Sequence, residues 1–289
     1  MKGKYRIYDN DTLLAEFDNI ITSEGKKVIG RFLAGQKSSW ADAVAIGAGS
    51  TSPNENNKSL EMEFWRDEID LKSYNESSGK ISLRSRIPAP IVGKIFEIGL
   101  YYTPAADGLY FTSPLISNFN LSVEDWSTGA ANTALRRIDS SALQISGGTS
   151  TEFDFEGDIR AFNNDTVFRL AYTADAGVSS VSLRLKSSDS DYREYSFTPA
   201  SSSYQVEDWK LQDFSVIGNP EWGEIYQVEI IAAGSGNIVL DGFSAIDERP
   251  SNPVSILVSR ALVSFSGENF FDKKPQRELQ LEYILELDL

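Results

Sequence analysis

The chain has 289 residues, of which 41% are hydrophobic and 24% charged, a composition typical of a folded protein with one to three domains. It contains no cysteine and no histidine, which excludes disulfides, thiolate or imidazole zinc sites, and Ser-His-Asp or Cys-His catalysis within this chain. The formal net charge of −15 would repel a phosphate backbone, so nucleic acid is not an expected partner.

The N-terminal sequence, MKGKYRIYDND, has no apolar segment of the kind found in secretory signals. No stretch of the chain approaches the ~20 apolar residues of a membrane-spanning helix, so membrane insertion is not expected. Residues 5–8 and 13–17 are predicted to form a hairpin around the turn at residues 9–11.

One helix is predicted directly after this hairpin. Thr22 is a suitable N-cap, and Gly35 stands where a left-handed C-terminal cap is expected. Between them, apolar residues recur at helical spacing and predict one buried stripe, formed by Val28, Ile29, Phe32 and Leu33.

Strands are predicted next at residues 43–47, 64–71, 80–87 and 95–101. The first of them leads into Gly47-Ala48-Gly49, which resembles the start of a dinucleotide-binding loop. The sequence then continues as Ser-Thr-Ser-Pro-Asn and not as a helix, so we interpret this segment as a turn.

The middle of the chain, residues 116–249, reads almost entirely as short strands separated by Gly, Ser, Asn and Asp, which predicts a two-sheet sandwich. The predicted strands are 142–145, 151–155, 166–172, 181–186, 193–198, 212–216, 226–232 and 238–243.

The final residues, 250–289, contain two predicted strands, 254–265 and 278–287. Two strands alone are marginally stable, so we expect them to complete the sheet of the first segment. The expected fold class is mainly β. A small α+β domain, with one helix and antiparallel strands in residues 1–115 plus 250–289, is interrupted by an inserted sandwich at residues 116–249.

Several side chains of the inserted segment are candidates for chemistry. Glu152, Asp154, Glu156 and Asp158 alternate with phenylalanines and would share one face of a strand. Such a row is most simply a solvated strand face, and paired carboxylates for glycosidase chemistry or calcium binding are the alternatives.

Aromatic residues of the same segment provide candidate surfaces for stacking on sugar rings. Trp126 and Trp209 are expected in the core of the sandwich. Tyr192 and Tyr195, beside the polar turn at residues 187–191, are either core or binding residues, and Trp222 is a candidate loop platform.

Three segments within residues 1–115 resemble a recurrent pattern in structural proteins of tailed-phage particles. They are Asn19-Ile20-Ile21-Thr22-Ser23-Glu24-Gly25, then residues 44–53 (VAIGAGSTSP), then Ile95-Phe96-Glu97-Ile98-Gly99-Leu100-Tyr101. Residues 258–263 (VSRALV) and the closing alternating strand are similar to the end of the same domain. The resemblance implies that the protein is made in the bacterial cytoplasm and assembles into a virion. Its expected partners are further copies of the same chain and other virion proteins, and no catalysis is expected.

The inserted segment resembles the jelly-roll carbohydrate-binding modules. The similarity is carried by Ile116-Ser117-Asn118-Phe119 near its start and by residues 236–243 (GNIVLDGF) at its end. Such modules often hold a structural calcium ion, and on that basis Asp241 is the candidate ligand, with partners expected from residues 118–124. The resemblance also makes Tyr192, Tyr195 and Trp222 candidate carbohydrate-binding residues.

The two resemblances together imply a phage structural protein, non-enzymatic and homo-oligomeric, that displays a glycan-binding jelly roll for host attachment from the tail or baseplate. A capsid decoration or head-fibre protein with a projecting jelly roll is the alternative. A polysaccharide depolymerase would need two carboxylates about 5 to 10 Å apart in a groove, and no pair of acids in the sequence stands out for this.

Overall fold

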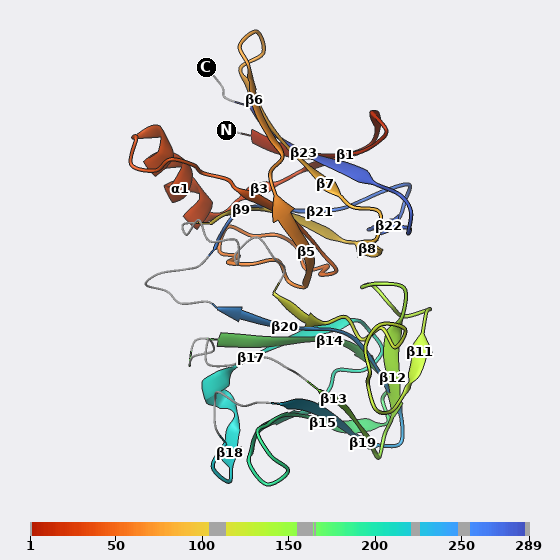
Figure 1. The fold of residues 1–289 in the computed structure, drawn as a ribbon. Coiled ribbons are helices and arrows are strands. Elements are labelled where there is room, and N and C mark those ends of the chain that lie inside the picture. The colour runs from red at the N-terminus through yellow and green to blue at the C-terminus, as the bar shows by residue number, and fades with distance from the viewer. Residues whose placement is uncertain are drawn as a thin grey trace. The chain divides into compact units, whose positions relative to one another are not determined.

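The computed structural model describes residues 2–103, 114–154, 164, 166–220, 226–247 and 255–286. The chain divides into two compact units: unit 1 is residues 1–114 with 250–289, and unit 2 is residues 115–249. Antiparallel strands form most of both units and one α-helix lies in the described part of unit 1, which confirms the predicted fold class (Figure 1).

Unit 1 contains two five-stranded antiparallel sheets. The first has the order β2 (Thr12–Asp18), β1 (Lys2–Asp9), β23 (Leu279–Glu286), β7 (Lys80–Ile87), β6 (Leu71–Asn75). The second has the order β3 (Ile20–Ile21), β21 (Ile256–Leu262), β9 (Glu97–Tyr102), β4 (Ala43–Gly47), β5 (Glu63–Glu68), and the short strands β8 (Gly93–Ile95) and β22 (Phe271–Lys273) pair beside them.

The last strand of the chain lies between β1 and β7, where Tyr283 is paired with Tyr5 on one side and Leu83 on the other. This pairing confirms that the C-terminal strand completes the sheet of the N-terminal segment. The two sheets contact each other through buried polar groups, since the Tyr5 hydroxyl lies 2.6 Å from Ser259 Oγ on β21.

The helix α1 (Ser23–Leu33) begins and ends as predicted. The Thr22 hydroxyl accepts a hydrogen bond from Gly25 N, and Gly35 has a φ of +71° after the last turn. The expected apolar stripe is too wide, however, because Leu33 is 67% exposed and the buried helix residues are Gly25, Val28 and Ile29. Gly25 is required there, since a Cβ would lie 2.2 Å from the Val258 carbonyl oxygen of β21.

The single strand predicted over residues 64–71 is wrong, because the chain changes sheets within it. β5 belongs to one sheet and β6 to the other, and the Ile69 amide at the crossing donates to the Asp42 carbonyl oxygen. The sequence does not reveal this crossing, because no glycine or proline interrupts residues 64–71.

Unit 2 is a sandwich of two antiparallel sheets. One has the order β11 (Ala130–Asn132), β12 (Ala142–Ser146), β20 (Asn237–Asp247), β14 (Thr166–Ala174), β17 (Gln205–Lys210), with β10 (Leu115–Ser117) also on β20. The other has the order β13 (Thr149–Asp154), β19 (Gln227–Gly234), β15 (Val178–Lys186), β16 (Tyr192–Phe197), β18 (Ser215–Ile217).

This strand order is that of a jelly roll. Setting aside β10, β11 and β18, the eight remaining strands form the sheets β12-β20-β14-β17 and β13-β19-β15-β16, and the chain crosses between them in the sequence of two interleaved Greek keys. Trp126 and Trp209 are 6% and 5% exposed within the hydrophobic core between the sheets, as expected from the sequence.

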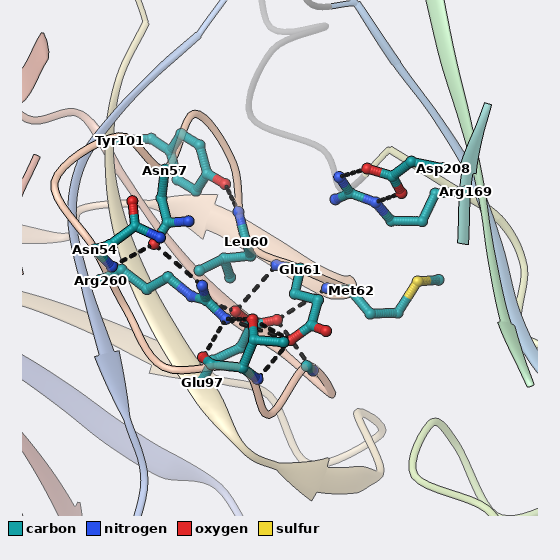
Figure 2. A network of polar contacts seen from close by, with 12 residues as sticks. Asn54, Asn57, Leu60, Glu61, Met62, Glu97, Tyr101, Arg169, Asp208 and Arg260 are labelled. Carbon is teal, nitrogen blue, oxygen red and sulfur yellow. Dashed lines mark hydrogen bonds and ion pairs between the residues drawn. The ribbon is translucent and has the colours of Figure 1, made fainter. Parts of the chain in front are cut away.

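Three of the segments singled out in the sequence of unit 1, residues 44–53, 95–101 and 258–263, meet at one buried ion pair (Figure 2). Glu97, at the start of β9, is fully buried, and its Oε2 accepts a 2.8 Å hydrogen bond from Nε of Arg260 on β21. The same carboxylate accepts hydrogen bonds from the backbone amides of Gly49, Glu61 and Met62 at 2.9–3.0 Å.

The other guanidinium nitrogens of Arg260 bind the same loop. They donate to the Thr51 carbonyl oxygen at 3.1 Å and to Asn57 Oδ1 at 3.2 Å. Gly47 and Gly49 are needed for this approach, because a Cβ on either would lie within 2.6 Å of Glu97 Oε1. The glycine loop that resembles a nucleotide-binding turn is therefore folded onto a carboxylate.

The variant Arg260→Met tests how much the stability of unit 1 depends on the Glu97–Arg260 ion pair. We expect the free energy of unfolding of unit 1 to fall by about 3–5 kcal/mol, because Glu97 stays buried without its cation. Urea denaturation read by hydrogen exchange of peptides from β9 and β21 measures this unit separately. Arg86→Met is the matched control: Arg86 and Glu278 form an exposed pair at 4.0 Å, and its loss should cost less than about 1 kcal/mol. If the two substitutions lowered the free energy of unfolding equally, the Glu97–Arg260 pair would not have the structural role assigned to it.

Candidate functional site

The outer surface of the sheet β13-β19-β15-β16-β18 carries an ordered set of charged and polar side chains. Leu183, Leu185, Val228 and Ile230 point into the core, so their neighbours along the strands point outward. We call this set the charged face; it consists of Glu152, Asp154, Arg184, Lys186, Tyr192, Glu194, Gln227 and Glu229.

Strand register places these residues in two rows across the sheet. In the first row Arg184 lies between Glu229 and Glu194, and Glu152 is paired with Glu229. In the second row Lys186 lies between Gln227 and Tyr192, and Asp154 is paired with Gln227. The two cations therefore occupy the middle of the face and the carboxylates surround them.

Both cations are bonded to several carboxylates. Arg184 Nε donates to Glu194 at 2.5 Å, and its Nη1 donates to Glu229 at 3.2 Å. Lys186 Nζ lies 3.3 Å from Glu152 Oε1, 3.2 Å from Asp189 Oδ1 and 3.9 Å from Glu229 Oε2. Burial acts to lower the pKa of Lys186, but Asp189, Glu152 and Glu229 outweigh it, so this pKa is raised and the ammonium stays charged.

Tyr192 is the aromatic residue of the charged face. Its ring is partly exposed, and the Arg184 guanidinium lies 4.8 Å from the ring centre. Tyr226, just before β19, is 41% exposed and its hydroxyl donates to Asp189 at 3.3 Å, which places a second aromatic ring beside Lys186. The sequence pattern did not single out Tyr226, because it stands at a strand end without a distinctive neighbour.

Tyr195 does not lie on this face. It is three residues from Tyr192 on the same strand, so it points to the opposite side, where its ring packs against Trp209 and Phe214 at centroid distances of 5.2 and 5.6 Å. Of the two roles left open for Tyr195, core or binding residue, this packing supports the core. Trp222 lies outside the described residues.

The row of acids predicted at residues 152–158 is partly placed. Glu152 and Asp154 lie on the charged face, where Glu152 contacts Lys186 and Asp154 accepts from Gln227 at 3.0 Å. Glu156 and Asp158 lie outside the described residues. A glycosidase needs a proton-donating carboxyl opposite a second carboxylate, whereas Glu152, Glu194 and Glu229 are each held in ion pairs with the central cations.

Asp241 is buried on β20 and does not have the surroundings of a calcium ligand. Its Oδ2 accepts from Arg137 N at 2.8 Å, and Ile138 N donates to the same carboxylate at 3.2–3.3 Å. These N–H groups would point at a bound cation, and no group of three or more acidic side chains suited to a metal occurs among the described residues.

The partners expected for Asp241 from residues 118–124 have a different role. The Glu124 carboxylate accepts hydrogen bonds from the amides of Asn118 and Phe119 at 3.0 Å and from Trp126 Nε1 at 3.0 Å. It also accepts from the Ser117 hydroxyl at 2.6 Å. Glu124 therefore closes a loop onto the start of the jelly roll, and the residues present do not fit a calcium ion.

Within the portion of the chain that the structure describes, no helix is long and apolar enough to cross a membrane.

Comparisons with known proteins give no sequence relative: no family model and no curated protein matches the chain. Several solved structures are similar to part of the chain. A family 11 carbohydrate-binding module from Clostridium thermocellum, in complex with a β-1,3-1,4-mixed-linked tetrasaccharide, is 14% identical over 46% of this chain and 94% of its own, with a TM-score of 0.38.

A family 16 carbohydrate-binding module is 15% identical over 46% of this chain and 99% of its own, with a TM-score of 0.31. An exo-β-agarase is 11% identical over 48% of this chain, but only 25% of the agarase is covered, with a TM-score of 0.39. At these scores the similarities say nothing about the site, and the assignment of a jelly roll rests on the strand order.

The buried Asp241 predicts a pH dependence of stability. Burial raises the pKa of Asp241 from the usual 3.8 to about 7, although the hydrogen bond from the Arg137 amide acts to lower this pKa. Folding therefore binds a proton between about pH 4 and 7, and this contribution is lost as the pH rises through 7. Raising the pH from 5 to 8 should cost the native chain about 2–3 kcal/mol of stability that Asp241→Asn does not lose.

The measurement is urea denaturation at both pH values, read by hydrogen exchange of peptides from β14 and β20. Asp125→Asn, which removes the same charge from an exposed loop position, is the control and should keep the native pH dependence. An unchanged pH dependence in Asp241→Asn would show that Asp241 does not titrate in this range.

Proposed function

We propose that this chain is a structural component of a tailed-phage particle and that its inserted jelly roll binds glycans on the host surface. The observation that carries the glycan-binding part is the charged face, which combines a partly exposed tyrosine ring with carboxylates held by two central cations. The virion part is supported by the resemblance of the motifs in unit 1, which are distant in sequence and converge on β9 and β21.

The charged face has the two kinds of group that sugar recognition needs. A tyrosine ring such as that of Tyr192 covers the apolar C–H side of a pyranose, while carboxylate oxygens accept hydrogen bonds from its hydroxyls. Arg184 and Lys186 hold Glu194, Glu229 and Glu152 in position, so little side-chain freedom would be lost on binding.

We propose binding without catalysis. Glu152, Glu194 and Glu229 are acceptors in ion pairs. Asp241, whose pKa is raised to about 7, is fully buried against the amides of residues 137 and 138. A depolymerase is the competing function, and an increase in reducing ends on incubation with host polysaccharide would support it.

In the particle, we propose a tail or baseplate adhesin that assembles with itself and with other virion proteins. A single weak sugar site becomes effective when several copies bind together. A capsid decoration or head-fibre protein with the same jelly roll is the second candidate. Immunogold labelling of purified particles with antibody against the chain distinguishes tail from capsid, and the absence of label on any particle would contradict the virion proposal.

Tyr192→Ala tests the binding surface. On a glycan array, followed by titration of the glycan that binds best, we expect a loss of affinity of about tenfold or more, equivalent to about 1.4 kcal/mol. Tyr74→Ala is the matched control, because Tyr74 is a 52% exposed tyrosine on the edge strand β6 of unit 1. Equal affinity of the Tyr192 variant and the native chain would remove Tyr192 from the site.

A further inference from the structure

We infer that the charged face selects neutral, hydroxyl-rich glycans and rejects glycans that carry carboxylate, sulfate or phosphate groups. The inference rests on the proposed glycan binding and names the chemical class of ligand for that site. It follows from the charges of the described residues on this face and from the partners that each of them already has.

The first step is the charge balance of the face. Glu152, Asp154, Glu194 and Glu229 lie on the strands, and Asp189 adds a fifth carboxylate from the adjoining turn. Only Arg184 and Lys186 oppose them, which leaves an excess of three negative charges among the described residues. An approaching anionic sugar is therefore repelled, and the repulsion is strongest at low ionic strength.

The second step is that both cations are already engaged. Arg184 donates to Glu194 and Glu229, and Lys186 contacts Glu152, Asp189 and Glu229. An anionic substituent would have to replace one of these carboxylates, which would then lose its partner at a position where Glu229 is only 12% exposed and the Lys186 side chain 8%. Exchanging one ion pair for another while leaving a carboxylate unpaired is unfavourable.

The third step is what the face can accept. Each carboxylate oxygen has lone pairs beyond those used by the cations, and hydroxyl donors satisfy these without adding charge. The next row toward the other end of the sheet is uncharged: Ser150, Ile231, Ser182 and Ser196 lie in register, with Ser182 Oγ and Ser196 Oγ 2.7 Å apart. Carboxylates, hydroxyls and the Tyr192 ring together match a polyhydroxylated neutral chain.

The test compares matched polysaccharides that differ only in charge. The full-length chain is titrated with a neutral glucan and its C6-oxidised counterpart, and with a neutral galactan and its sulfated counterpart. We expect each anionic member to bind about tenfold or more weakly in low salt, with the difference shrinking at about 0.5 M salt as charges are screened.

A charge-neutralising variant separates electrostatics from shape. In Glu152→Gln with Asp154→Asn, two of the five carboxylates lose their charge while the cations remain, and binding of the anionic polysaccharides should improve several-fold relative to the native chain. Glu76→Gln with Glu278→Gln removes the same charge from exposed positions of unit 1 and should leave the selectivity unchanged. Circular dichroism melting checks that both variants are folded.

The outcomes distinguish the two proposals. If the anionic members bind as well as or better than the neutral ones at low salt, the inferred selectivity is overturned while glycan binding stands. If neither neutral nor anionic polysaccharides bind the native chain, the proposed glycan binding is overturned and the selectivity falls with it.

Discussion

The ion pair between Glu97 and Arg260 determines how unit 1 can be built from two distant pieces of chain. Arg260 arrives more than 160 residues after Glu97, and the two side chains lie on the adjacent strands β9 and β21 with almost no exposure to solvent. A buried pair of this kind adds little net stability, but an unpaired charge in its place is strongly unfavourable. Any fold of unit 1 in which β21 does not pair with β9 would therefore leave the Glu97 carboxylate buried without its cation. The amides of Gly49, Glu61 and Met62 complete the site, so the loop between β4 and β5 is fixed by the same carboxylate.

The insertion of unit 2 leaves the sheet of unit 1 intact because its two connections leave from neighbouring positions. Tyr102 at the end of β9 is paired with Ile256 at the start of β21. Within unit 2 the first strand is likewise paired with the last, since Leu115 and Phe243–Ser244 belong to the β10–β20 ladder. Each unit thus has its chain ends side by side, which is the condition under which one domain can be placed inside another without breaking either core.

The sequence predicted the elements whose signals are local and missed the relations that depend on the third dimension. Thr22 and Gly35 mark the ends of the helix because caps have fixed chemistry, and the clean alternation of residues 279–286 marks the closing strand. The exposed Leu33 and the sheet crossing at residues 69–70 required knowledge of what each element packs against. The opposite orientations of Tyr192 and Tyr195, in contrast, follow from their spacing of three residues on one strand. Asp241 stood out correctly as an acid inside a strand, but its partners are amides of residues 137 and 138, roughly a hundred residues earlier.

The alternation of β15 and β19 separates what folds the jelly roll from what it can bind. Leu183, Leu185, Val228 and Ile230 fill the core, while Arg184, Lys186, Gln227 and Glu229 form the charged face from the intervening positions. Alternate residues along a strand stay on the same face of the sheet as long as the strand register is kept. Substitutions on the outer surface therefore change charge and hydrogen bonding without changing the core volume. The two central cations nevertheless restrict this freedom, since removing either would leave several carboxylates crowded together. A face with this arrangement can vary most readily at its rim, at positions such as Asp154, because substitutions there leave the ion pairs at its centre in place.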